Sequence, residues 1–196
     1  MMETTIQNET LNDLLAILGI DNHRMLPALR SIAENHTKYL RDLKINVGNV
    51  LKLETLTEKE KMLLAYAVAV NERNEVLQAS FSIKAAEAGA SPEELAETVA
   101  CVSLLQVNNV FYRFRHFAKK EVYEKTPAGI KMSIMMSPLL GKEFFELLSL
   151  CISALNGCEL CVSAHEESVL KHGGTEQRIF DAVRFTAVMK GLVSLI

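Results

Sequence analysis

The chain of 196 residues has no tryptophan, only 6% aromatic residues and four prolines. No run approaches 18 uninterrupted apolar residues, so the sequence predicts no membrane-spanning helix. A formal net charge of −3 and a pI near 6.0 provide no basic surface of the kind that binds nucleic acid. The N-terminal residues Met1 to Thr5 lack the cationic start and apolar core of a secretory signal. We therefore expect a cytoplasmic protein with no nucleic-acid or membrane partner.

Helix signals recur along most of the chain. Thr57 and Glu60 form a capping box, in which each side chain bonds the backbone amide of the other residue. Ser91 and Glu94 form a second box, with Pro92 at the first helical position. Apolar residues follow each box with helical spacing, and alternating β-branched segments are few. These patterns predict an all-α fold.

An internal duplication is also visible. The segment Gly89–Val99 runs parallel to Gly173–Val183, with Gly, Ser/Thr, Leu/Ile, Glu/Asp and Val at matching places. Each segment follows a helix that begins about thirty residues earlier, a period typical of a stacked helical unit. We predict one domain over residues 1–196, with copies of the unit at about 56–115 and 139–196. Only the second copy carries paired thiols, so one chain is expected to contain one active site.

The stretch from Asn156 to His165 reads Asn-Gly-Cys-Glu-Leu-Cys-Val-Ser-Ala-His. Asn156-Gly157 is a strong helix breaker, so a new helix is expected to start at Cys158. At about 100° per residue, Cys158 and Cys161 lie about 60° apart on this helix, with His165 between them in angle. Amides at a helix N-terminus stabilise a thiolate, and an imidazole can take the thiol proton. Because His165 faces Cys161 more closely, we predict that Cys161 attacks and Cys158 resolves.

The cysteines allow two other interpretations. Free cysteines are often small buried hydrophobes, which is what we expect of Cys101 and Cys151 on their apolar helix faces. The thiol pair and its histidine are also ligand types that zinc accepts, with Glu146 as a fourth. No second Cys-x-x-Cys or His-x-x-x-His motif completes a structural zinc site. In a reducing cytosol, a catalytic dithiol without bound metal is therefore the favoured interpretation.

Glu146 lies in an otherwise apolar stretch, Phe144 to Leu148. A carboxylate in such a stretch is either exposed at a helix edge or buried beside a partner such as an imidazole. The sequence leaves both arrangements open.

Other polar and sulfur-containing residues are expected to be structural. The methionine-rich run, Met132, Met135 and Met136, is predicted to fill gaps in the core. Arg113 and Arg115 alternate with aromatic residues, a pattern that can bind nucleic acid, but the acidic chain and the isolation of the patch favour packing or a contact between subunits. The remaining histidines have no local partner pattern and are expected to have surface or structural roles: His23, His36, His116 and His172.

These residues resemble the alkyl hydroperoxidase D family, within the carboxymuconolactone decarboxylase-like superfamily. Three stretches carry the resemblance: Asn108–Arg113, Lys131–Leu147 and Ser153–Glu166. The arrangement of Glu, eleven residues, Cys-x-x-Cys, three residues and His is specific to the peroxidase members of this superfamily. The resemblance covers at least residues 56–196.

The resemblance implies an all-helical, duplicated fold that assembles into homotrimers or larger rings such as hexamers. It also implies an antioxidant enzyme that reduces organic hydroperoxides and binds no cofactor. The residue matching Cys161 attacks the peroxide and becomes a sulfenic acid, and the residue matching Cys158 resolves it into a disulfide and exchanges with a partner peroxiredoxin. Glu146 and His165 match the proton relay of the family. The implied reductant is a dihydrolipoyl group on a subunit of a dehydrogenase complex.

The chain departs from the family at one position. Well-known members have a second relay histidine directly before the second cysteine, where this chain has Leu160. The relay would then shorten to Glu146 and His165. A weakened relay favours a second hypothesis, a disulfide-exchange adaptor that reduces a partner peroxiredoxin and turns over little peroxide itself. A third hypothesis, a decarboxylase-like lyase, is disfavoured because lactone chemistry does not require paired thiols.

Overall fold

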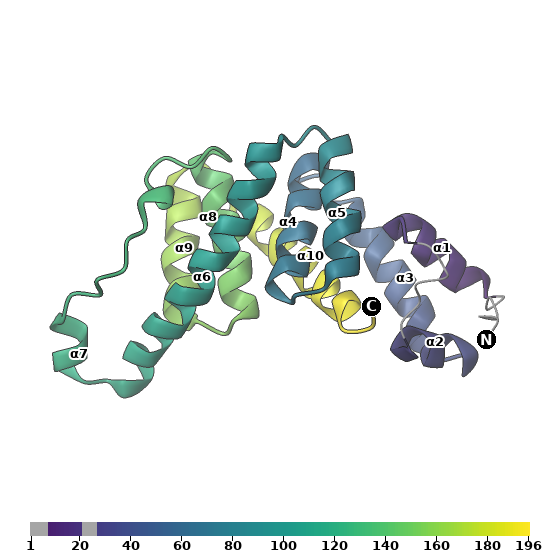
Figure 1. The fold of residues 1–196 in the computed structure, drawn as a ribbon, viewed down its shortest axis with the longest axis horizontal. Helices are drawn as coiled ribbons and strands as arrows, with labels where there is room; N and C mark the ends of the chain where they lie inside the picture. The colour runs from purple at the N-terminus through teal and green to yellow at the C-terminus, as the bar shows by residue number, and fades with distance from the viewer. Residues whose placement is uncertain (1–7, 21–26) are drawn as a thin grey trace.

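The computed structural model describes residues 8–20 and 27–196, and Figure 1 shows that the fold is a stack of helices. No strand occurs in the described ranges, so the all-α prediction is confirmed. One 3-10 turn, η2 (Ser133–Met135), precedes α8. The α-helices are α1 (Glu9–Leu18), α2 (Pro27–Glu34), α3 (Lys38–Leu51), α4 (Glu58–Asn71), α5 (Glu75–Glu87), α6 (Pro92–Ala118), α7 (Glu121–Lys125), α8 (Lys142–Leu155), α9 (Glu159–Lys171) and α10 (Glu176–Val193).

Both predicted capping boxes are present. The Thr57 hydroxyl accepts from the Glu60 amide at the start of α4, and the Glu60 carboxylate accepts from the Thr57 amide. The same reciprocal pair joins Ser91 and Glu94 at the start of α6, where Pro92 occupies the first helical position. These contacts satisfy amides that have no partner within the helix, so the starts of α4 and α6 follow from local sequence.

Helix α6, with 27 residues, forms the long diagonal of the molecule and packs against α4, α8 and α9 (Figure 1). Helix α10 packs against α3, α4 and α8, while α1 to α3 lie at one end of the molecule and α7 at the other (Figure 1). The core between these helices is apolar, with Leu105, Phe145, Leu147 and Phe185 fully buried. Burial of such side chains supplies the main favourable term for folding.

The two segments of the predicted duplication contain helices in the same order, α4–α5–α6 and α8–α9–α10. Helices α4 and α8 each have 14 residues, and α5 and α9 each have 13. The helices before α6 and α10 are each followed by a glycine in the left-handed region, Gly89 at φ 92° and Gly173 at φ 97°. These glycines end the helices as expected. The duplication itself stays a prediction.

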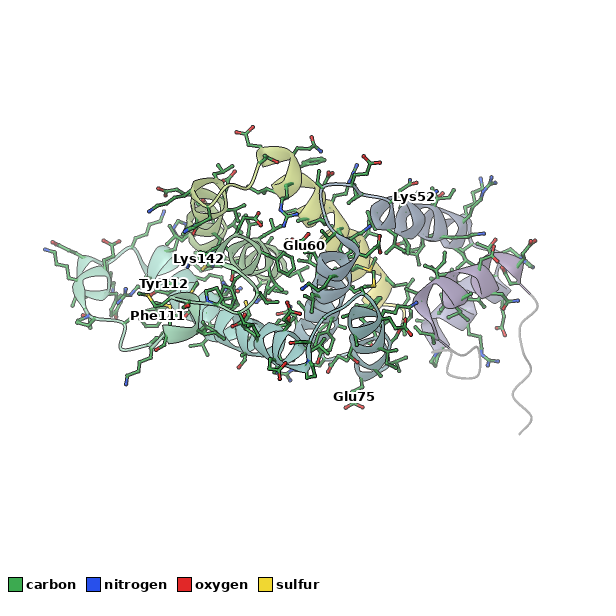
Figure 2. All side chains as sticks on the ribbon, turned by 90° about the horizontal axis from the view of Figure 1, so that it is seen from above. Lys52, Glu60, Glu75, Phe111, Tyr112 and Lys142 are labelled. Carbon is green, nitrogen blue, oxygen red and sulfur yellow. A yellow bond between two sulfur atoms is a disulfide. The ribbon has the colours of Figure 1, made fainter. Side chains whose placement is uncertain are left out.

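A charged cluster joins the two segments. Arg178, on α10, donates to Glu60 of α4 at 2.5 Å and to Glu143 of α8 at 2.9 Å. Its side chain is 17% exposed, so these charge-assisted bonds are largely shielded from water. Figure 2 shows Glu60 in the middle of the molecule, away from the end where Tyr112 and Lys142 lie.

None of the helices in the described ranges is long and apolar enough to cross a membrane. The cytoplasmic location remains a prediction from the sequence.

Candidate active site

The site begins at the turn between α8 and α9. Helix α8 ends at Leu155, and Gly157 follows with φ 68°, a left-handed conformation that glycine adopts without steric cost. Cys158 is the N-cap residue of α9, so the expected helix start is confirmed. Its side chain makes no capping hydrogen bond, and Cys161 lies one turn into the helix. The first amides of α9 therefore lie beside the thiol pair without a side-chain cap.

A polar network from α4 and α6 fixes this turn. The side-chain amide of Asn156 donates through Nδ2 to Asn109 Oδ1 at 2.9 Å. Its Oδ1 atom accepts from Asn71 Nδ2 at 3.1 Å. Asn109 is 1% exposed and donates to Ser153 Oγ at 3.0 Å. The Arg113 guanidinium donates to the carbonyl oxygen of Asn156 at 2.5 Å. Arg113 therefore packs within its own chain, which is one of the two roles expected for it.

The structure joins Cys158 and Cys161 in a disulfide. The two residues are 1% and 7% exposed, so the bond lies just beneath the surface. The two cysteines line different hollows: Cys161 lines one with His165, and Cys158 lines another with Ala154 and Gly157. The dithiol thus has two separate approaches.

His165 and Glu146 form a buried pair, which settles the question left open for Glu146. The His165 Nδ1 atom lies 2.6 Å from Glu146 Oε2, and the two residues are 8% and 3% exposed. Because an ionised carboxylate can only accept, Nδ1 carries the hydrogen and donates it. The other ring nitrogen, Nε2, is then free to exchange a proton with a neighbouring group.

A third group, Lys142, completes this arrangement. Its ammonium donates to Glu146 Oε1 at 2.6 Å and to the carbonyl oxygen of Met135 at 2.7 Å. Burial by itself raises the pKa of Glu146, but the hydrogen bonds from His165 and Lys142 outweigh it and hold that pKa at about 2. Glu146 is therefore ionised at neutral pH and holds the imidazole in one orientation.

Cys161 and His165 line a cavity of about 260 Å³. Its other walls are largely apolar and come from α6, the segment around η2 and the start of α9: Asn108, Tyr112, Met132, Met135, Leu160 and Ala164. Figure 2 shows Tyr112 and Lys142 at the end of the molecule opposite Lys52. The site thus combines a dithiol, a carboxylate-held imidazole and an apolar cavity large enough for a small organic molecule.

The prediction that the methionine run fills gaps in the core holds only in part: Met135 packs against the core, whereas Met136 does not. Met132 and Met135 are only half-buried and form cavity wall beside the disulfide, and Met136 is 83% exposed. The run lies in the irregular segment between α7 and α8, and Met132 accepts a hydrogen bond from Asn108 of α6, a contact that local spacing could not reveal. Met132 and Met135, with their polarizable thioethers, therefore also form part of the cavity wall.

The remaining cysteines are inert by position. Cys101 and Cys151 are fully buried, and desolvation raises the pKa of each thiol to about 12. They are free thiols, as expected. At neutral pH neither supplies a thiolate.

The other histidines lie outside this site. The His172 ring bonds the Ser168 carbonyl oxygen at the end of α9, and His116 lies 3.5 Å from the exposed Glu159 carboxylate. His36 has φ 50° at the end of α2, and His23 falls outside the described residues. Within residues 8–20 and 27–196, no group of three or more His, Cys, Asp or Glu side chains is arranged to hold a metal ion.

Comparison with known proteins places the chain in a family. The carboxymuconolactone decarboxylase family matches residues 123–194. The "Alkyl hydroperoxide reductase AhpD" of Anaeromyxobacter dehalogenans strain 2CP-1 is 38% identical over 164 residues, which is 84% of this chain and 88% of that protein. The chain belongs to the alkyl hydroperoxide reductase AhpD family.

Other relatives have the same name and a similar extent. The protein from Rhizorhabdus wittichii is 35% identical and spans 86% of this chain and 96% of its own length. A crystal structure from Burkholderia xenovorans LB400, assigned as a gamma-carboxymuconolactone decarboxylase subunit, superposes with a TM-score of 0.67. It covers 95% of this chain and 94% of that chain at 14% identity, which supports the fold alone.

Two functional contributions were missed at the sequence level. The contact between Lys142 and Glu146 follows an i,i+4 spacing on one helix, so a signal for it was present. The cavity wall from α6, with Asn108 and Tyr112, depends on packing between distant segments and has no local signal.

Proposed function

We propose that this protein is an antioxidant thiol peroxidase that reduces organic hydroperoxides through a dithiol/disulfide cycle at Cys161 and Cys158. Membership of the alkyl hydroperoxide reductase AhpD family makes it an oxidoreductase of the peroxidase type. The observation that carries the cycle is the Glu146–His165 pair beside Cys161 on one apolar cavity. That arrangement provides a nucleophile, a base and a place for a substrate.

The oxidative half of the cycle starts from the reduced pair. His165 Nε2 takes the Cys161 proton, and the thiolate attacks the terminal oxygen of R–O–OH. An S–O bond forms as the O–O bond breaks, which gives Cys161–SOH and an alkoxide. The imidazolium returns its proton to the alkoxide, so the organic product is the alcohol.

The second step closes the disulfide. The Cys158 sulfur attacks the Cys161 sulfur, an S–S bond forms and the S–O bond breaks, and the departing hydroxide leaves as water after taking a proton. The net reaction converts two thiols and one hydroperoxide into a disulfide, an alcohol and water. The disulfide in the structure corresponds to the product of this step.

An external dithiol then restores the thiols, and a dihydrolipoyl group is our proposed reductant. The hollow beside Cys158 supports an approach from this side, because it is separate from the cavity that takes the oxidant. A lipoylated dehydrogenase-complex subunit and a peroxiredoxin are the proposed protein partners. Both would react by thiol–disulfide exchange at Cys158, and no bound cofactor is required.

A homo-oligomer, as a trimer or a hexamer, is part of this proposal. The outer half of α6 and the adjoining α7 expose a row of large apolar side chains: Val107, Val110, Phe114, Phe117 and Val122. Phe117 alone is 71% exposed. Such a continuous apolar face on a protruding helix is typical of a contact between copies. Phe117→Glu is expected to lower the mass measured by light scattering, and an unchanged mass would exclude this face.

The disulfide-exchange adaptor remains the second candidate because of Leu160. This side chain is 45% exposed and lines the cavity where the family has a relay histidine. The thiol peroxidase and the adaptor differ in the expected rate at which hydroperoxide oxidises the dithiol. Rapid turnover of hydroperoxide without any partner protein would exclude the adaptor, whereas fast partner reduction with slow peroxide turnover would support it.

The proposal is tested by steady-state consumption of cumene hydroperoxide with dihydrolipoamide as the reductant. The wild type is expected to turn over, and Cys161→Ser is expected to lose all turnover. Unchanged turnover in Cys161→Ser would rule out the assigned nucleophile. A lyase, the third hypothesis, would keep its activity in the Cys158→Ser/Cys161→Ser double variant.

A further inference from the structure

The cavity beside Cys161 contains one buried polar side chain whose hydrogen bonding is incomplete. Asn108, on α6, lines this cavity and is 5% exposed. Its Oδ1 atom is buried without a hydrogen-bond partner. Its Nδ2 atom donates to the Met132 sulfur at 3.2 Å. A thioether is a weak acceptor, so both ends of this amide are poorly satisfied.

Rotating the amide does not remove the deficit. Exchanging the oxygen and the nitrogen would put the carbonyl oxygen against the same sulfur and leave the NH₂ group without a partner. Buried amides in proteins are nearly always paired, and an incompletely paired one calls for an explanation, of which a catalytic role is one. The neighbouring Asn109, by contrast, both donates and accepts within the turn network, so the deficit is specific to Asn108.

The position of Asn108 relates it to the reacting atoms. Met132, whose sulfur accepts from the Asn108 N–H, also lines the cavity, together with Cys161 and His165. An oxygen-containing molecule in the cavity would offer a stronger acceptor than sulfur. The amide N–H therefore has a reason to exchange Met132 for the bound molecule.

We propose that the Asn108 N–H binds the hydroperoxide and stabilises the oxygen that leaves as alkoxide. This inference rests on the proposed function and assigns a further catalytic residue to it. During the attack, the Cys161 thiolate forms the S–O bond, the O–O bond breaks, and negative charge develops on the oxygen attached to carbon. The Asn108 donor stabilises that charge until His165 delivers its proton and the alcohol forms.

This role supplies a polar contact that Leu160 cannot give. Leucine has no hydrogen-bond donor, so in this chain the cavity depends on donors from α6 and on the His165 ring. The other walls, Met132, Met135 and Tyr112, leave room for an apolar organic group. The ligand class is therefore a small organic hydroperoxide with one apolar substituent.

The test compares two oxidants of similar size that differ in leaving group. Reduced protein is mixed with cumene hydroperoxide, which expels an alkoxide, or with peroxybenzoic acid, which expels a carboxylate. Asn108→Leu is expected to slow oxidation by cumene hydroperoxide about 10- to 100-fold, the usual effect of removing one donor to a developing charge. Oxidation by peroxybenzoic acid should fall by less than about 3-fold, because a carboxylate needs little stabilisation.

The reductive half-reaction is the internal control. Reduction of the disulfide by dihydrolipoamide does not involve an oxygen leaving group, so Asn108→Leu should leave its rate unchanged. Asn108→Ser, which keeps a shorter hydrogen-bond donor, is expected to react with cumene hydroperoxide at an intermediate rate. This variant replaces Asn108→Leu in the test if the leucine variant is unstable. Equal losses with both oxidants, or no loss with either, would overturn the inference. If the reduced wild type itself does not react with cumene hydroperoxide, the proposed function is wrong. That outcome differs from a failure of the Asn108 inference, in which the wild type reacts but the variant does not show the expected difference between the two oxidants.

Discussion

The segments α4–α5 and α8–α9 have helices of equal length, but only the second carries the cysteine pair and the histidine of the candidate site. The spacing that separates Gly89 from Gly173 also pairs Asn74 with Cys158, Leu77 with Cys161 and Phe81 with His165. Leu77 and Phe81 are core residues, 0% and 3% exposed. At positions that correspond by this spacing, the first segment therefore has core side chains where the second has the cysteine pair and the histidine.

The N-terminal caps of α5 and α9 also differ. Asn74 accepts a hydrogen bond from the Leu77 amide and so caps α5, whereas Cys158 makes no capping bond to α9. An asparagine cap is usually worth about 1 kcal/mol of stability. In α9 no side chain caps the first amides, so they are left available to the adjoining sulfurs.

The largest effect is expected when the two cysteines at the start of α9 are replaced by the residues at the corresponding positions of α5. The double variant Cys158→Asn/Cys161→Leu is expected to fold, because the same pair starts α5. Its hydroperoxide turnover should fall on the order of 10³-fold or more, since no nucleophile remains. Circular dichroism checks the helix content and peroxide consumption checks the activity. Substantial remaining turnover would contradict the assignment of the thiols.

A second change acts on the base rather than on the nucleophile. Glu146 corresponds by the same spacing to Met62, an almost fully buried residue of α4. Glu146→Gln keeps the size of the side chain but removes the charge that orients His165. We expect the rate of oxidation by hydroperoxide to fall about 10- to 100-fold. A rate equal to that of the wild type would remove Glu146 from the relay.

The same residue predicts a dependence of stability on pH. The pKa of Glu146 is about 2 in the folded protein, compared with an ordinary value of 4.5. Because the folded pKa is lowered, the ionised carboxylate stabilises the fold above about pH 4.5, and this contribution is lost as the pH falls towards about 2. Urea titrations at stepped pH should show this loss in the wild type. The Gln variant should lack that part of the acid dependence.

The third change tests packing after α9. Gly174 corresponds to Ala90, which is buried after α5. A Cβ at Gly174 would lie 2.4 Å from Val169 Cγ1 and 2.7 Å from Glu143 Oε1. Gly174→Ala is therefore expected to cost about 1–3 kcal/mol of unfolding free energy. Thermal melts check this value, and a stability equal to that of the wild type would mean that the loop adjusts freely.

The smallest expected effect concerns the turns before α5 and α9. Arg73, at φ 58°, holds the left-handed conformation that Gly157 holds at φ 68°. Arg73→Gly should relieve this strain and raise the unfolding free energy by up to about 1 kcal/mol. Gly157→Ala is the matched opposite change and should lower it. A loss of stability in Arg73→Gly would indicate that contacts of the arginine outweigh its backbone strain.

How far the sequence predicts this molecule depends on the range of each interaction. The capping boxes at Thr57 and Ser91 and the break at Gly157 involve residues a few positions apart, so their patterns predicted them correctly. The burial of Glu146 stayed open because its partner, His165, lies on the next helix. The exposure of Met136 and the place of Met132 in the cavity wall could not be predicted, because the pattern of a segment does not reveal which distant helix it covers.

The account is tested most directly by a thiol titration with mass analysis after one equivalent of cumene hydroperoxide is added to the fully reduced protein. We predict rapid loss of two thiols, with a disulfide between Cys158 and Cys161, while Cys101 and Cys151 stay reduced because burial raises the pKa of each to about 12. Four unreacted thiols after the peroxide is added, or oxidation at Cys101 or Cys151 instead, would contradict the account.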